Sequence, residues 1–162
     1  MSIKIREMIP NDLSYIIDIW NEVVSAGTAF PQNEIFDISS GEKFFASQSY
    51  VGVAEDEKNQ VVGVYILHPN NIGRCGHISN ASYAVKGTER GKHIGEALVR
   101  DCLKIAKQLG FGILQLNVVV ATNVRALRLY EKIGFIKLGT IPKGFLKSDG
   151  TYEDVIPHYI TL

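Results

Sequence analysis

Cysteine is scarce in this sequence: there are two, Cys75 and Cys102, and neither belongs to a C-x-x-C pattern. Isolated cysteines of this kind suggest neither a disulfide framework nor a zinc site. Long apolar runs are missing as well, and the first residues do not form the apolar segment of a signal peptide. We therefore expect a soluble, cytoplasmic protein with no role in a membrane.

The sequence also lacks an excess of charge of either sign, because lysine and arginine together number 17 and aspartate and glutamate together number 17. A protein that binds nucleic acid non-specifically usually carries a basic field, so we expect no nucleic-acid partner. The four histidines are scattered, which gives no metal-ligand pattern and predicts no metal. The length of 162 residues fits one domain, residues 1–162, with a sizeable core.

Hydrophobic periodicity predicts one mixed α+β domain. The expected strands span residues 3–6, 50–55, 61–67, 77–85, 113–120, 135–138 and 155–162, and the expected helices span 13–24, 39–48, 94–109 and 122–133. Ser39 and Glu42 are three residues apart and predict a capping box at the start of the second helix. Residues 142–150 are expected to form a loop. The strand at 113–120 closely follows a helix, which predicts a parallel crossover.

One stretch, residues 83–110, combines a strand end, a basic glycine-rich loop and an amphipathic helix. The first turn of a helix has unpaired N–H groups and the positive end of the helix dipole, and glycines allow a phosphate to come close. Gly87, Gly91 and Gly95 are evenly spaced, so they fit neither the dinucleotide fingerprint nor the Walker loop. The pattern predicts an anion site, and an ordinary strand-to-helix turn is the alternative that this loop alone leaves open.

Two segments resemble the signatures of the GNAT superfamily of acetyl-coenzyme A-dependent N-acetyltransferases. Residues 90–95, RGKHIG, resemble its pyrophosphate loop, with His93 where a glycine usually stands, and residues 123–135, NVRALRLYEKIGF, resemble its second signature. The resemblance covers essentially the whole chain. It implies a central mixed sheet of about seven strands, splayed between the fourth and fifth and flanked by about four helices. We expect His93 to lie in the first turn of the helix, where a side chain is tolerated.

The resemblance implies acetyl-coenzyme A as the cosubstrate. The residues expected to bind it are Ala84, Val85, Arg90, Gly91, Lys92, His93, Ile94, Gly95, Asn117, Asn123, Ala126 and Tyr130. Asn123, Ala126 and Tyr130 share one helix face, where the pantetheine arm is expected to lie. Backbone N–H groups near Ala84 and Val85, freed by the splay, are expected to hold the thioester oxygen and stabilise its developing charge.

The implied chemistry is direct attack by a substrate amine, with Tyr130 as general acid. A tyrosine hydroxyl has a pKa of about 10, close to that of an alkyl thiol, so it can protonate the departing sulfur. His77 is a candidate base, with Glu55 or ordered water as alternatives, and neither cysteine lies in a setting typical of a nucleophile.

The expected acceptor is a primary amine of a small or amino-acid-like molecule, contacted by Phe30, Asn80 and Tyr83. Phe36 could line the same pocket, but we expect it to pack beneath the loop at residues 25–37. Two other functions remain open, a non-catalytic acyl-coenzyme A sensor and acetylation of a peptide or protein amine. A homodimer through the C-terminal strands is expected by analogy alone.

Overall fold

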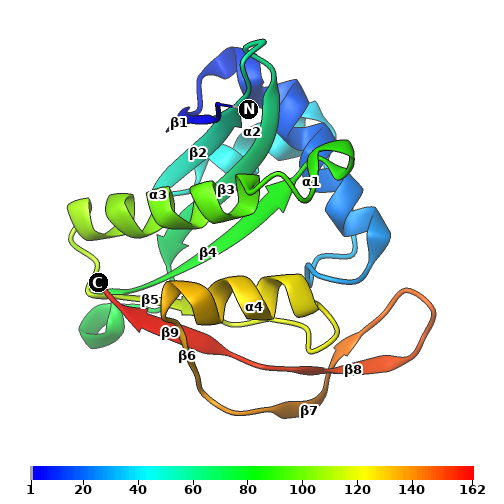
Figure 1. Cartoon of the computed structure of the whole chain (residues 1–162), viewed down its shortest axis with the longest axis vertical. Helices are drawn as coiled ribbons and strands as arrows, with labels where there is room; N and C mark the ends of the chain where they lie inside the picture. Colours follow the sequence, from blue (N-terminus) through cyan, green and yellow to red (C-terminus); the bar gives the residue numbers. More distant parts are fainter. Residues whose placement is uncertain (1) are drawn as a thin grey trace.

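The computed structural model describes residues 2–162, and a seven-stranded mixed sheet forms its centre (Figure 1). In spatial order the strands are β1 (Lys4–Glu7), β2 (Tyr50–Glu55), β3 (Val61–Pro69), β4 (Ile78–Val85), β5 (Ile113–Leu116), β9 (His158–Thr161) and β6 (Ile136–Lys137). Neighbouring strands are antiparallel except β4 and β5, which are parallel. The α+β class and the parallel crossover are confirmed.

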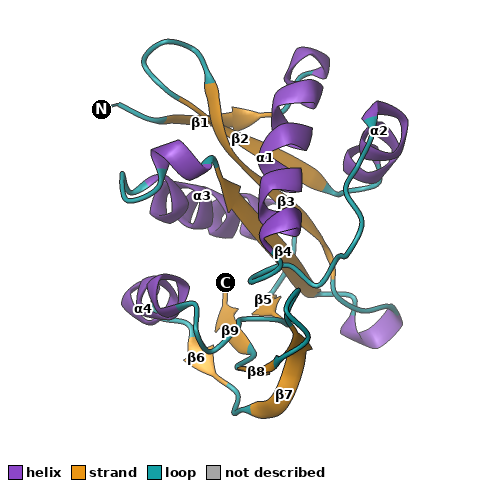
Figure 2. Cartoon of the chain, turned by 90° about the vertical axis from the view of Figure 1, so that its right-hand side faces the viewer, coloured by secondary structure: helices purple, strands orange, loops and turns teal. Residues whose placement is uncertain are grey.

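Two helices cover each face of the sheet (Figure 2). One face carries α1 (Leu13–Ala26) and α2 (Ile38–Ala46), and the other carries α3 (Ile94–Gln108) and α4 (Val124–Ile133). Short 3-10 turns occur at Pro10–Asp12, Gly73–Cys75 and Gly87–Glu89. Each face of the sheet buries its own apolar cluster, because strand side chains alternate between the faces. Across residues 2–162, every helix is too short or too polar to traverse a bilayer.

The strands β4 and β5 form a fork. Their ladder contains three residue pairs and ends at Asn80 and Gln115, although β4 continues to Val85. At that point the Asn80 amide donates a hydrogen bond from Nδ2 to the Gln115 carbonyl at 2.8 Å. One residue earlier, the Ser79 hydroxyl donates to the Ile113 carbonyl at 2.9 Å. These side chains supply bonds where the two backbones separate, and the expected splay between the fourth and fifth strands is confirmed.

The C-terminal region differs from the expectation. Residues 142–150 are not all loop, because β7 (Ile141–Leu146) and β8 (Tyr152–Val155) pair as a hairpin outside the main sheet (Figure 1). Pro142 and Gly144 are poor strand formers and concealed β7 from the sequence pattern. The single strand expected at 155–162 is two strands, β8 and β9, with Pro157 between them.

This hairpin has a small apolar cluster of its own, formed by Phe145, Val155 and Val120. Val120 also pairs with Val155 as an isolated bridge. At the tip of the hairpin, Ser148 approaches Gly27 so closely that a Cβ at Gly27 would lie 2.8 Å from the Ser148 Cβ. The hairpin therefore contacts both the segment after β5 and the end of α1.

The capping residue of α2 was predicted at the wrong position. Asp37, not Ser39, caps the helix: its carboxylate accepts a hydrogen bond from the Ser40 N–H at 2.7 Å, and the Ser40 hydroxyl accepts one from the Asp37 N–H at 3.0 Å. Both pairs have the three-residue spacing of a capping box. Asp37 precedes Ser39 and occupies the cap first, so the helix begins at Ile38.

Candidate active site

Two connected cavities lie where the fork opens. The larger one, about 780 Å³, lies between the β4–α3 loop and α4, and we call it the loop groove. The smaller one, about 530 Å³, lies above the fork against α2 and the segment after β5, and we call it the fork cavity. Both are lined by Ala29, Tyr83, Asn123 and Ala126, so they are continuous. Of the residues expected to bind the cosubstrate, the loop groove is lined by Ala84, Val85, Arg90, Gly91, His93, Ile94, Gly95, Asn123 and Ala126.

Main-chain N–H groups at the start of α3 form one wall of the loop groove. No side chain among residues 2–162 caps this helix, and its first bond back to the loop runs from the Ala97 N–H to the His93 carbonyl at 3.2 Å. The N–H groups of Ile94, Gly95 and Glu96 therefore precede the first helical bond and lack a partner within the described chain. Such donors, together with the helix dipole, make an anion site.

His93 adopts a conformation that we did not expect. It lies at the N-cap of α3 with φ 62° and ψ 12°, in the left-handed region that glycine enters freely. The expectation that it lies in the first helical turn is wrong. The loop must reverse direction before the helix begins, and this reversal imposes the left-handed backbone on whichever residue occupies the position.

Gly95 leaves room in the groove. A Cβ at this residue would contact no backbone, and its nearest neighbours would be Leu129 Cδ2 at 3.9 Å and Val85 Cγ2 at 4.0 Å. Those two side chains belong to opposite walls, so the missing methyl group corresponds to free space between them. Like His93, Gly91 has a left-handed backbone in this loop, with φ 83°. The absence of side chains here allows a phosphate to approach the main chain closely.

Formal charges around the loop are mostly paired. Arg90 lies 3.6 Å from Glu22 of α1, and Lys92 forms an ion pair with Glu89 at 2.6 Å. Lys92, expected to bind the cosubstrate, does not line the groove. Glu96 does line it and is held by Arg100 at 2.8 Å and by Lys132 of α4 at 2.7 Å. Hydrogen bonds from Lys132 and Arg100 lower the pKa of Glu96.

The free edge of β4 offers further donors. The Lys86 N–H bonds to the Val62 carbonyl, and residues of an antiparallel pair alternate between bonded and non-bonded positions. In the β3–β4 register, this alternation means that the Ala84 N–H points toward β3 and bonds there. The N–H groups of Tyr83 and Val85 point the other way, toward the fork. Of the two donors expected near the thioester, Val85 is therefore available and Ala84 is not, and Tyr83 joins it.

Tyr130 lines the fork cavity from α4, with its ring centroid 5.3 Å from that of Phe135 and 5.8 Å from that of His158. Its hydroxyl makes no hydrogen bond within residues 2–162. Burial, and secondarily Cys102, raises the pKa of Tyr130, so this phenol holds its proton at neutral pH. Asn123 caps α4 by accepting a bond from the Ala126 N–H at 3.3 Å. Its amide nitrogen remains free to donate to a ligand.

The polar lining of the fork cavity is rich in acceptors and contains no Asp, Glu, Lys or Arg side chain among the described residues. Two buried polar atoms on this lining lack a partner within residues 2–162, namely Gln32 Oε1 and Gln48 Oε1. An unpaired buried polar atom costs about 1–3 kcal/mol. The cavity is therefore built to pair with hydrogen-bonding groups of a guest, without a fixed charge of its own.

The three residues predicted for the acceptor all reach the fork cavity. Phe30, Asn80 and Tyr83 line it, and Asn117, expected at the cosubstrate, lines this cavity and not the groove. Phe30 is also a core residue, with its ring centroid 4.5 Å from that of Trp20. Phe36 packs against the core as expected.

His77 and Glu55 lie outside both cavities. His77 is exposed beside Gly112, and Glu55 forms an ion pair with Arg6 at 2.7 Å. The imidazole at the fork cavity is His68, near the end of β3, which sequence reasoning missed because the expected strand ended at residue 67. Its Nδ1 lies 2.9 Å from the Pro69 carbonyl. A carbonyl can only accept, so in the neutral form of this imidazole Nδ1 carries the proton and Nε2 is an acceptor.

A helix start with unpaired N–H groups beside a strand fork agrees with the match of residues 13–135 to the acetyltransferase (GNAT) family. The chain belongs to this family. The family assignment establishes the acetyltransferase class, and it agrees with both motifs quoted above.

Individual relatives extend the likeness over nearly the whole chain. The chain is 28% identical to N-acetyltransferase aca1 of Schizosaccharomyces pombe, a match that covers 94% of this chain and 80% of the relative. It is 25% identical to an L-methionine sulfoximine/L-methionine sulfone acetyltransferase of Pseudomonas aeruginosa, over 88% of this chain and 86% of the relative. It superposes with a TM-score of 0.92 on a phosphinothricin acetyltransferase of Sinorhizobium meliloti solved in complex with AcCoA, at 22% identity, covering 100% of this chain and 89% of the other.

Proposed function

We propose that this protein is an N-acetyltransferase that moves the acetyl group of acetyl-coenzyme A to a primary amine of a small molecule. The observation that carries the proposal is the continuity of the two cavities. A groove with a main-chain phosphate cradle leads, past Asn123 and Ala126, into a cavity lined with hydrogen-bond acceptors. A donor molecule and an amine can therefore meet at the fork.

Acetyl-coenzyme A would supply an acetyl thioester at the fork. The free N–H groups of Ile94, Gly95 and Glu96 suit its pyrophosphate, and the gap at Gly95 is the space that this group needs. The free amide nitrogen of Asn123 suits the pantetheine arm, and the fork-facing N–H groups of Tyr83 and Val85 suit the thioester oxygen. The relative named an L-methionine sulfoximine/L-methionine sulfone acetyltransferase supports a small-molecule acceptor.

Tyr130 is the proposed proton donor to sulfur. The sequence-based expectation assumed that the pKa of the Tyr130 hydroxyl is close to that of an alkyl thiol, and the pKa of Tyr130 is raised above that value. Burial has the same effect on thiols in this region, since it raises the pKa of Cys102 to about 12. A thiolate released into the same low-dielectric surroundings is destabilised in the same way. The two groups therefore remain matched, and the phenol can give its proton to the departing sulfur.

His68 and Asn80 are the proposed partners of the amine. They are opposite each other on β3 and β4, so their side chains lie on the same face of the sheet. Nε2 of His68 is an acceptor, and Oδ1 of Asn80 remains free because Nδ2 is bonded to Gln115. A neutral imidazole next to a bound amine can take the proton that the amine must lose. His68 thus replaces His77 as the proposed base.

The test is a coenzyme A release assay with purified protein over a panel of amines, combined with Tyr130→Phe. The hydroxyl bonds to nothing within residues 2–162, so its loss leaves the fold intact. We expect unchanged acetyl-coenzyme A affinity and a kcat lowered about 100-fold. Tyr159→Phe is the matched control, since Tyr159 lines neither cavity. Coenzyme binding without turnover of any amine by the wild-type protein would instead identify a sensor.

A further inference from the structure

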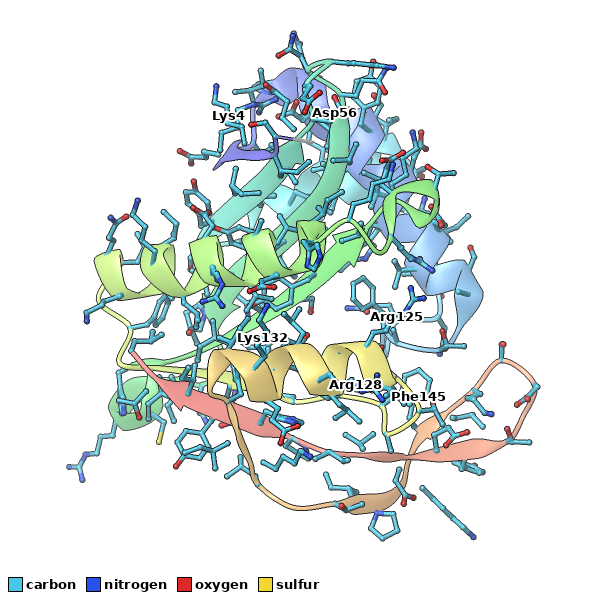
Figure 3. All side chains as sticks on the ribbon, in the orientation of Figure 1. Lys4, Asp56, Arg125, Arg128, Lys132 and Phe145 are labelled. Atoms are coloured by element: carbon cyan, nitrogen blue, oxygen red, sulfur yellow. The ribbon has the colours of Figure 1, made fainter. Side chains whose placement is uncertain are left out.

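Three cations lie in a row on α4. Arg125, Arg128 and Lys132 are spaced three and four residues apart, which places them along one side of the helix (Figure 3). The Lys132 ammonium reaches across to Glu96 of α3, at 2.7 Å. This side of α4 is therefore directed toward α3, across the loop groove. Arg125 and Arg128 both line that groove.

The two arginines differ from the other cations around the groove because they have no carboxylate partner. Arg90, Lys92 and Lys132 each form an ion pair. Within residues 2–162 neither Arg125 nor Arg128 lies within ion-pair distance of an acidic side chain, and neither donates a hydrogen bond. Like charges one helical turn apart repel each other. An anion bound between them would relieve this repulsion.

The position of the arginines separates them from the phosphate cradle. Arg125 and Arg128 are exposed, whereas Ala126 and Leu129 beside them are half-buried. The arginines thus form the solvent-side rim of the groove on the α4 wall. The N–H groups of the cradle belong to the opposite wall, at the start of α3. The groove therefore offers anions two binding places of different chemistry, main-chain donors on one wall and guanidinium groups on the other.

We propose that Arg125 and Arg128 form a subsite for the 3′-phosphate of the coenzyme A ribose. The inference rests on the proposed use of acetyl-coenzyme A. That molecule carries two anionic units, the pyrophosphate, which suits the cradle, and one phosphomonoester. A phosphomonoester is a compact dianion near neutral pH, and guanidinium groups bind phosphate through paired N–H donors. Its exposed position on the ribose agrees with an exposed rim.

The experiment measures the dissociation constants of coenzyme A and of 3′-dephospho-coenzyme A by calorimetry, without turnover. The proteins are the wild type, Arg125→Gln, Arg128→Gln and the double variant. We expect the wild type to bind coenzyme A about tenfold more tightly than the dephosphorylated ligand. In the double variant the two constants should agree within about twofold, with the affinity for the dephosphorylated ligand unchanged. The preference should also shrink as salt is added.

Arg74→Gln is the matched control. Arg74 is exposed, has no ion pair within residues 2–162 and lines neither cavity, so its replacement removes one positive charge and should keep the tenfold preference. Equal affinity of the wild type for both ligands would overturn the subsite. Equal weakening of both ligands in the double variant would overturn it too, because the arginines would then bind the pyrophosphate. If neither ligand binds to the wild type, the proposed function fails, which is a separate outcome.

Discussion

The glycine at position 95 provides the sharpest test of the phosphate cradle, because stability and binding are expected to change in opposite directions. In Gly95→Ala the new methyl group meets only ordinary van der Waals contacts, at 3.9 Å from Leu129 and 4.0 Å from Val85. The fold tolerates it without rearrangement. The methyl group nevertheless enters the space between the walls of the groove, which we assign to the coenzyme.

The magnitudes follow from the position of the residue. Alanine is about 1 kcal/mol better than glycine inside a helix, and Gly95 is the second residue of α3. About half of that gain is therefore expected, a rise in melting temperature of about 1–2 °C. A methyl group in a fitted site costs binding about 1.4 kcal/mol, so the dissociation constant of coenzyme A should rise about tenfold.

Thermal melts and calorimetric titration of coenzyme A measure both effects on the same preparation. Gly112→Ala is the matched control, because its added Cβ would lie 3.7 Å from His77 and Gly112 lines neither cavity. It should leave the affinity unchanged. A Gly95→Ala protein that is slightly more stable and binds coenzyme A as tightly as the wild type would refute the assignment of the groove.

Three other changes have defined outcomes. His93→Gly removes a non-glycine residue with a left-handed backbone, so the free energy of unfolding measured in urea titrations should rise by about 0.5–1 kcal/mol. A loss of stability would show that the backbone at His93 is not strained. Asn80→Ala leaves the Gln115 carbonyl without its donor and should lower the free energy of unfolding by about 1–2 kcal/mol, whereas wild-type stability would show that the fork does not need this bond. Burial lowers the pKa of His158, although the Ile156 carbonyl opposes this, so its contribution to stability is full above about pH 6.5 and is lost as the pH falls toward the lowered pKa. Urea unfolding between pH 7 and 5 should show that decline, and it should flatten in His158→Gln.

The layout of the sheet and helices was accessible from the sequence because α1, α3 and α4 have strong amphipathic periods and the strands have apolar alternation. Gly134 directly follows the expected helix at 122–133 and has the left-handed backbone of a helix C-terminus, with φ 108°. The hairpin at β7 was missed because strand pairing overrode the weak propensity of Pro142 and Gly144. Hydrophobic periodicity does not report such pairing, even between strands that follow each other in the chain.

Within the site, most residues of the two short motifs line the loop groove, although Lys92 does not. Of the isolated candidates, Asn80 and Tyr83 line the fork cavity, whereas His77 lies outside both cavities. The loop at 90–95 and the helix from Asn123 to Tyr130 follow local rules, so their mutual arrangement could be inferred. Choosing His68 over His77 required knowledge of which end of β4 faces the fork. Only the register between β4 and β5 supplies that information, and it places His77 at the closed end.

The C-terminal hairpin has a consequence for how this enzyme could diversify. Its small apolar cluster supports Val120, which lines the fork cavity, and its tip at Ser148 approaches Gly27, just before the segment that carries Phe30. None of its residues lines the loop groove. Insertions or substitutions in residues 147–151 can therefore act on the wall of the fork cavity, the proposed acceptor site, and through Gly27 they also reach Ala26 and Thr28, which line the loop groove.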